Sequence, residues 1–190
     1  PADLILVAVK FYDLDEAIRN MRLHVGSETV ILSLMNGISS EEMLGKAFGM
    51  EKILYGLVIS IDGNRDQNEI RFTSYGTIVF GEAANTVWSE KVQAVARLFD
   101  RAGIVYRVPE DMMHVLWYKY MINIGINQGS VALMAPYGVF QDMPDAEAVV
   151  ESAMQEVIRV ANHRGIGLGE ADIVAWRSVL AGMNPDSRTS

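Results

Sequence analysis

Cysteine is absent from this sequence of 190 residues, and histidine occurs only three times. Without cysteine the chain has neither a disulfide framework nor a thiolate metal site. His24, His114 and His163 lie far apart and follow no spacing typical of metal ligands, so we expect no metal site. These absences argue against the disulfide-rich and zinc-binding classes of small protein.

Long apolar segments are also missing. The longest apolar run near the start, Leu4 to Val9, is too short for a signal sequence core or a membrane span, and it follows Asp3 rather than a basic segment. We therefore expect a cytoplasmic protein.

Positive charge is in the minority, with 16 Lys and Arg against 24 Asp and Glu, which gives a net charge of −8. Such a balance disfavours binding to nucleic acid backbones or anionic membrane surfaces, because both attract basic faces. An anionic small molecule is still allowed, since it needs only one or two local cations. Half of the residues are hydrophobic, which is typical of a folded protein with a sizeable core.

Strand and helix patterns alternate in the first part of the chain. Residues 4–9 and 30–35 have the apolar character of strands buried on both faces, as in parallel sheets. Each run is followed by a possible capping residue, Asp13 or Ser39, with a glutamate three positions later. This alternation predicts a parallel α/β sheet with a ligand crevice beyond the carboxyl ends of its strands.

The pattern changes near residue 110. Three further strands are expected at 53–61, 70–81 and 104–108, with an amphipathic helix over 86–102, so the sheet is mixed at its edge. After that the periodicity is helical, over 111–133, about 145–163 and 170–181. The sequence predicts an α/β domain with a mixed sheet in residues 1–109 and an all-helical domain in residues 110–190.

Lys119, Asn123 and Asn127 are four residues apart in an apolar helical segment and share one face of it. Asparagine is unfavourable inside helices because its side chain competes for backbone hydrogen bonds. One amine and two amides can bind a ligand with hydroxyl, carbonyl and carboxylate oxygens, and a partly buried amine can donate a proton. The alternative is structural, with the asparagines bonded to neighbouring loops and the lysine reaching water.

Three segments, in order and at similar spacing, resemble motifs of the ketopantoate reductase family: Asp3–Lys10, Leu34–Ile38 and Trp117–Asn127. The resemblance also places residues 72–82 on late strands of the family's nucleotide-binding domain. It implies a Rossmann-type domain that binds NADPH, followed by a helical domain, and reduction of a 2-ketoacid such as 2-dehydropantoate to its 2-hydroxyacid.

The resemblance also implies roles for single residues. Lys119 matches the family's general acid, and Asn123 and Asn127 match its substrate-binding amides. Lys10 and Asn36 match residues near the nicotinamide end of the cofactor, although local sequence alone favours a strand-end lysine in water and an Asn-Gly turn. Ser190 matches a serine that binds the substrate carboxylate.

Two parts of the family pattern are not found in this sequence. The family begins with a strand and the motif G-x-G-x-x-G, whose backbone amides bind the pyrophosphate, whereas Gly165, Gly167 and Gly169 follow a helical segment. The family also has a further helical segment with an acidic active-site residue. These departures predict a fragment that is itself inactive.

Two alternatives to this function are open. One is a related 2-hydroxyacid dehydrogenase with a different substrate, because the helical domain sets the shape of the substrate site. The other is a non-catalytic module for assembly, and a homodimer is compatible with either. A fragment whose first apolar strand has an unpaired edge is also expected to self-associate.

Overall fold

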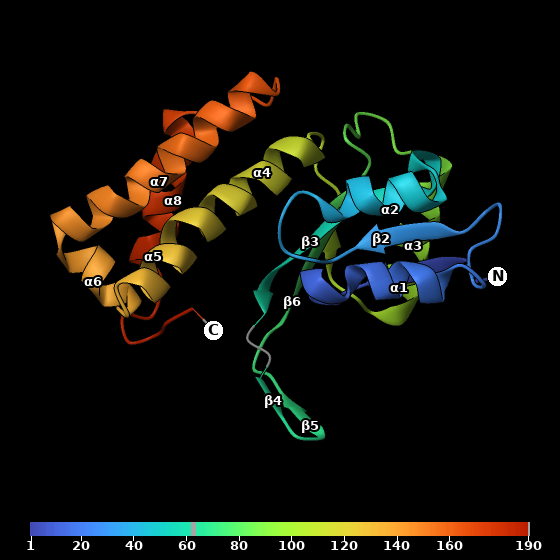
Figure 1. Cartoon of the computed structure of the whole chain (residues 1–190), viewed down its shortest axis with the longest axis horizontal. Helices are drawn as coiled ribbons and strands as arrows, with labels where there is room; N and C mark the ends of the chain where they lie inside the picture. The colour runs from blue at the N-terminus through green and yellow to red at the C-terminus, as the bar shows by residue number, and fades with distance from the viewer. Residues whose placement is uncertain (62–63, 190) are drawn as a thin grey trace. The chain divides into compact units, whose positions relative to one another are not determined.

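The computed structural model describes residues 1–61 and 64–189, and the chain divides into two compact units, Pro1–Leu116 and Trp117–Ser190. Figure 1 shows the strands in the first unit and the long helices of the second. Among the described residues, no helix combines the length and apolar character that crossing a membrane requires.

A five-stranded mixed sheet forms the centre of the first unit. Its order is β1 (Leu4–Val7), β2 (Val30–Ser33), β3 (Ile53–Ile61), β6 (Tyr75–Gly81) and β7 (Tyr106–Arg107). The pairs β1–β2, β2–β3 and β6–β7 are parallel, and β3–β6 is antiparallel. Parallel strands next to one antiparallel pair agree with the mixed sheet that the sequence predicts.

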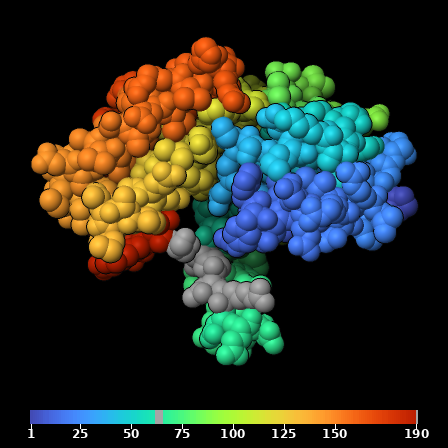
Figure 2. All heavy atoms as spheres, in the orientation of Figure 1, coloured from blue at the N-terminus to red at the C-terminus, as the bar shows by residue number. Residues whose placement is uncertain are grey.

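The expected strand over 70–81 is in fact two strands. Its first part, β5 (Glu69–Arg71), pairs with β4 (Asn64–Asp66) in a separate two-stranded sheet, and only β6 joins the main sheet. Figure 2 shows this hairpin standing away from the rest of the first unit. Its residues Glu69, Ile70 and Arg71 are exposed, so it contributes little to the core.

Helices cover both faces of the sheet. On one face α1 (Leu14–Met21) and α2 (Ser40–Phe48) pack on Val7, Ile31 and Ile53 through their own buried side chains. On the other face α3 (Glu90–Ala102) packs on Leu32, Leu54 and Phe80. Adjacent residues of β2 therefore belong to different cores, as the period of two in a strand requires.

The capping boxes expected at Asp13 and Ser39 are not formed. Neither side chain makes a capping hydrogen bond, because both residues already have helical backbone angles, with ψ of −4° and −17°. An N-cap needs an extended backbone to aim its side chain at the free amides. Ser89, with ψ of 165°, has that conformation and accepts a hydrogen bond from the Val92 amide at the start of α3.

The second unit is helical. Its segments are the end of α4 (Met112–Ile122), a π-helical turn at Asn123–Asn127, α5 (Gln128–Ala132), α6 (Tyr137–Asp142), α7 (Pro144–His163) and α8 (Glu170–Ala181). Its buried residues include Met121, Ile126, Met154 and Trp176. A helical region that follows a Rossmann-like mixed sheet confirms the predicted fold class.

Candidate functional site

Lys119, Asn123 and Asn127 lie on one helical segment of the second unit, and all three side chains are partly buried. The Asn127 amide nitrogen donates to the Asn123 amide oxygen over 3.0 Å. The structural alternative expected bonds from these asparagines to loops, and the bond observed joins them to each other instead. The Asn123 amide nitrogen and the Asn127 amide oxygen take no part in this bond.

The two asparagines begin and end a π-helical turn. The backbone amide of Gln128 donates to the carbonyl of Asn123, five residues earlier, which is the hydrogen bond that defines a π-turn. Single π-turns inside α-helices occur frequently at functional sites. The sequence showed the spacing of the polar residues but did not show this turn.

Burial lowers the pKa of Lys119 from its ordinary value of 10.5, because the charged ammonium loses water. Among the residues of the second unit that the structure describes, no carboxylate forms an ion pair with it. The neighbouring Tyr118 has a raised pKa, caused by burial and, to a smaller extent, by the charge of Asp172. An amine in such a position gives up its proton more readily than a solvated lysine.

Lys10 and Asn36 lie beyond the carboxyl ends of neighbouring parallel strands of the first unit. Val7 of β1 is paired with Ser33 of β2, and Lys10 and Asn36 each lie three residues farther along the chain. Both side chains are exposed. The structure therefore brings them to the edge of the sheet where ligands of open α/β sheets bind.

A buried polar chain supports the loop that contains Asn36. The amide of Met35 donates to the Ser33 hydroxyl over 3.4 Å, Ser33 and Ser40 share a hydrogen bond of 2.8 Å, and Ser40 donates to Glu41 over 2.9 Å. Glu41 is 1% exposed, and its other carboxylate oxygen has no partner among the described residues. Burial raises the pKa of Glu41, and hydrogen bonding by its own backbone amide, by the Ser40 hydroxyl and by the Gly56 backbone opposes that rise in part.

Sequence reasoning missed Glu41, because it treated Glu42 as the acidic residue of a capping box. The spacing of Glu41, Leu44 and Gly45 places them on one helix face, and this pattern is visible in the sequence. The structure buries all three residues. A carboxylate on the apolar face of a helix needs a structural or chemical reason.

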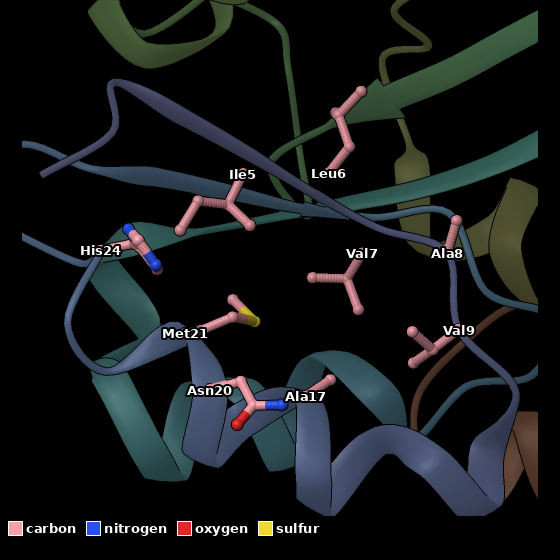
Figure 3. A pocket seen from close by; sticks show the side chains of 9 residues that line it. All are labelled: Ile5, Leu6, Val7, Ala8, Val9, Ala17, Asn20, Met21 and His24. Carbon is pink, nitrogen blue, oxygen red and sulfur yellow. The ribbon is translucent and has the colours of Figure 1, made fainter.

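An apolar hollow lies beside β1 and α1 in the first unit. Figure 3 shows Ile5 and Val7 pointing from β1 into it, with Ala17 and Met21 of α1 on the opposite side. Within the described strands, β1 pairs with β2 alone, so its other edge is open next to the hollow. None of the predicted site residues lines it.

The predicted residues thus fall into two groups. Lys119, Asn123 and Asn127 belong to the second unit, whereas Lys10 and Asn36 belong to the first. Ser190 lies outside the described residues. The roles assigned to all six stay predictions.

Two models of one protein family match the chain. The model described as Ketopantoate reductase PanE/ApbA matches residues 1–85, and the model of the C-terminal part of the same family matches residues 111–190. The matches follow one another in the order of the chain.

Individual relatives agree with the family models. A 2-dehydropantoate 2-reductase of Halobacterium salinarum is 27% identical over 182 residues, which are 95% of this chain and 59% of the relative. A crystal structure of 2-dehydropantoate 2-reductase from Geobacter metallireducens is 27% identical, with a TM-score of 0.88, over 100% of this chain and 63% of that one. The chain therefore spans less than two thirds of each relative.

A more distant structure shares the fold alone. A ternary structure of D-mandelate dehydrogenase with NADH and anilino(oxo)acetate has a TM-score of 0.84 at 18% identity, and it covers 100% of this chain and 61% of that one. Since the two family models match both parts of the chain in order, and relatives match it almost throughout, the chain belongs to the ketopantoate reductase family.

Proposed function

We propose that this chain is part of an NADPH-dependent reductase that converts 2-dehydropantoate to pantoate, or reduces a similar 2-ketoacid. Family membership supports the reaction class. The observation that carries the proposal is the partly buried Lys119 on the same helical stripe as a hydrogen-bonded pair of amides. A protein of the relatives' length that contains this chain is called the family-length enzyme below.

Lys119 is the proton donor in this proposal. Reduction of a ketone adds hydride to the carbonyl carbon, and the carbonyl oxygen then gains negative charge. A proton from the Lys119 ammonium neutralises that charge and produces the hydroxyl group. The pKa of Lys119, which burial lowers, favours this transfer over the transfer from a fully solvated lysine.

Asn123 and Asn127 bind the substrate. Their mutual hydrogen bond fixes both amide planes and leaves the Asn123 N–H donors for hydroxyl or carboxylate oxygens and the Asn127 amide oxygen as an acceptor for a hydroxyl group. We include Ser190 in the proposal as a donor to the substrate carboxylate.

Lys10 and Asn36 are proposed to hold the nicotinamide end of the cofactor. Their position beyond the parallel strand ends fits the ribose and carboxamide, which accept hydrogen bonds from an amine and an amide. NADPH, when bound, supplies the hydride. This sequence has no G-x-G-x-x-G after a strand to bind the pyrophosphate, so we propose that the chain as given is inactive.

The test is Lys119→Ala in the family-length enzyme. We expect turnover of 2-dehydropantoate with NADPH to fall by a factor on the order of 10² or more, because general acid catalysis contributes about that much. The measurement is the steady-state rate of NADPH oxidation.

Lys46→Ala is the matched control. Lys46 is 73% exposed and pairs with Glu42 on the surface of α2, so its removal should leave turnover unchanged. A Lys119→Ala enzyme that keeps the wild-type rate would refute the assignment of the proton donor.

A second candidate is a dehydrogenase of the same fold with another 2-hydroxyacid substrate. The fold shared with D-mandelate dehydrogenase favours it, since mandelate is itself a 2-hydroxyacid. A panel of 2-ketoacids, assayed with NADPH and with NADH on the family-length enzyme, separates the two. A kcat/KM highest for 2-dehydropantoate with NADPH supports the first candidate, and a preference for an aryl 2-ketoacid supports the second.

A further inference from the structure

The π-turn changes how the polar residues line up along the helix. An α-helix turns by about 100° per residue, so side chains four residues apart differ by about 40° around the axis. In an uninterrupted α-helix, Asn127 would therefore lie about 80° away from Lys119. At that angle the side chains of Lys119 and Asn127 point in clearly different directions, so one small ligand could not lie directly over both.

A π-turn reverses the direction of this angular shift between residues four apart. Its hydrogen bond closes one residue later than in an α-helix, so each residue turns by only about 85°. Across the π-turn, Asn127 then falls about 20° behind Asn123 rather than 40° ahead of it. Lys119 and Asn127 are left within roughly 20° of each other, so the amine and both amides face the same direction.

Gly125, at the centre of this turn, is buried against α7. A Cβ atom at this position would lie 2.5 Å from Met154 Cε, 2.7 Å from Met154 Cγ and 3.2 Å from Val150 Cγ1. Met154 is 0% exposed and Val150 is 1% exposed, so neither side chain can withdraw into solvent. Because α7 fills the space that a side chain would need, any larger residue here must displace the turn or repack α7.

We propose that Gly125 is a positioning residue: its contact with α7 holds the π-turn that aligns Asn123 and Asn127 with Lys119, so that one substrate binds all three. This inference rests on the function proposed above. Gly125 touches no substrate and acts only through the two asparagines. A displacement of about 1 Å in such a site is enough to cost a large part of the activity.

The kinetic test compares Gly125→Ala with the wild-type family-length enzyme. We expect the KM for 2-dehydropantoate to rise by a factor on the order of 10, while the KM for NADPH changes less than about twofold. A general loss of structure would raise both constants or lower the amount of folded enzyme, so the split between them is specific to positioning.

Gly167→Ala is the matched control, because a Cβ at Gly167 meets nothing within 4 Å. Both KM values should stay at the wild-type level in this variant. If Gly125→Ala does not fold, Met154→Phe takes its place, since it enlarges the buried side chain that α7 places against Gly125. The same rise in substrate KM is expected.

The double variant Gly125→Ala/Met154→Ala provides a rescue. It removes the two closest atoms that the new Cβ would meet, Cγ and Cε of Met154. The substrate KM of the double variant should return close to that of Met154→Ala alone. A double variant as impaired as Gly125→Ala would overturn the proposal.

A spectroscopic measurement on the chain as given does not depend on activity. The side-chain amide signals of Asn127 report its hydrogen bond to Asn123, and Gly125→Ala should shift them while Gly167→Ala should not. If the wild-type enzyme reduces no 2-ketoacid, the proposed function fails, and these signals alone decide the positioning: a shift supports it, and no shift overturns it. Where the enzyme is active, an unchanged substrate KM overturns the inference whatever the amide signals show.

Discussion

At the scale of single residues, burial shifts the pKa of the partly buried Lys119 and of the fully buried Glu41. Burial disfavours the charged form of each, so it lowers the pKa of the lysine and raises the pKa of the carboxylic acid. Each shift has a consequence that depends on pH. For Lys119 the consequence is catalytic, and for Glu41 it concerns stability.

We predict that the rate of reduction by the family-length enzyme falls as the pH rises, and that this fall occurs below pH 10.5. Only the protonated Lys119 donates, and its lowered pKa moves the loss of that proton below the ordinary value. The measurement is the pH profile of kcat/KM with saturating NADPH. A profile that stays level up to pH 10.5 would contradict this assignment.

Glu41→Gln is predicted to stabilise the first unit at neutral pH by on the order of 1 kcal/mol. The pKa of Glu41 is raised above 4.5, so its protonated form favours folding at low pH, and this stability is lost as pH rises through the raised value. The advantage of the glutamine variant should therefore be small at pH 4.5 and grow toward pH 7. Urea unfolding across this range measures it.

Glu42→Gln is the control, since Glu42 is 63% exposed and forms an ion pair with Lys46, which is 73% exposed. Surface ion pairs contribute about 0–1 kcal/mol, so this variant should show little pH-dependent change relative to the wild type. If the free energy of unfolding depends on pH in the same way in Glu41→Gln and Glu42→Gln, burial of Glu41 has no energetic effect and the prediction is wrong.

At the scale of elements, the open edge of β1 is the feature with the clearest consequence. Its backbone groups are unpaired on one side among the described strands, and Leu6 is 47% exposed. An apolar strand with a free edge is a template for pairing with another chain. The hollow lined by Ile5 and Val7 adds apolar surface next to this edge.

The chain as given should therefore self-associate, and Leu6→Lys should reduce this association. Light scattering should give a mass above the 21.0 kDa of one chain for the wild type, and a mass closer to it for the variant. Leu23→Lys is the control, because Leu23 is 90% exposed but follows α1 rather than lying on the strand edge. A wild-type chain that is monomeric at all concentrations would contradict the prediction.

At the scale of the whole molecule, the chain has residues from both parts of the family yet spans only 59% of the Halobacterium relative. In the sequence as given, the cofactor contacts we propose are limited to Lys10 and Asn36. Two exposed side chains supply few of the fixed donors that phosphate groups need.

We predict that NADPH shows no saturable binding to the chain as given in the micromolar range, whereas the family-length enzyme binds it. A fluorescence titration, together with the intact mass of each protein, measures this difference. Micromolar binding by the 21.0 kDa chain would show that the described strand ends suffice for the cofactor.

Local sequence pattern was enough to predict most elements of this fold. Uninterrupted apolar runs indicated β1 and β2, and helical periodicity indicated α7 and α8 almost to their ends. These predictions succeed because each element buries its own residues at a fixed period. The four-residue spacing of Lys119, Asn123 and Asn127 was visible for the same reason.

Tertiary structure decided the features that depend on contacts between distant residues. The pairing of β6 with β3 separates it from β5, the π-turn places Gly125 against Met154, and the burial of Glu41 depends on where α2 meets the sheet. None of these has a local signature that determines it, because the energy of each comes from side chains far away in the sequence. The sequence by itself determined most of the elements and which face of each is apolar, whereas packing decided how the strands pair and how the polar groups are aimed.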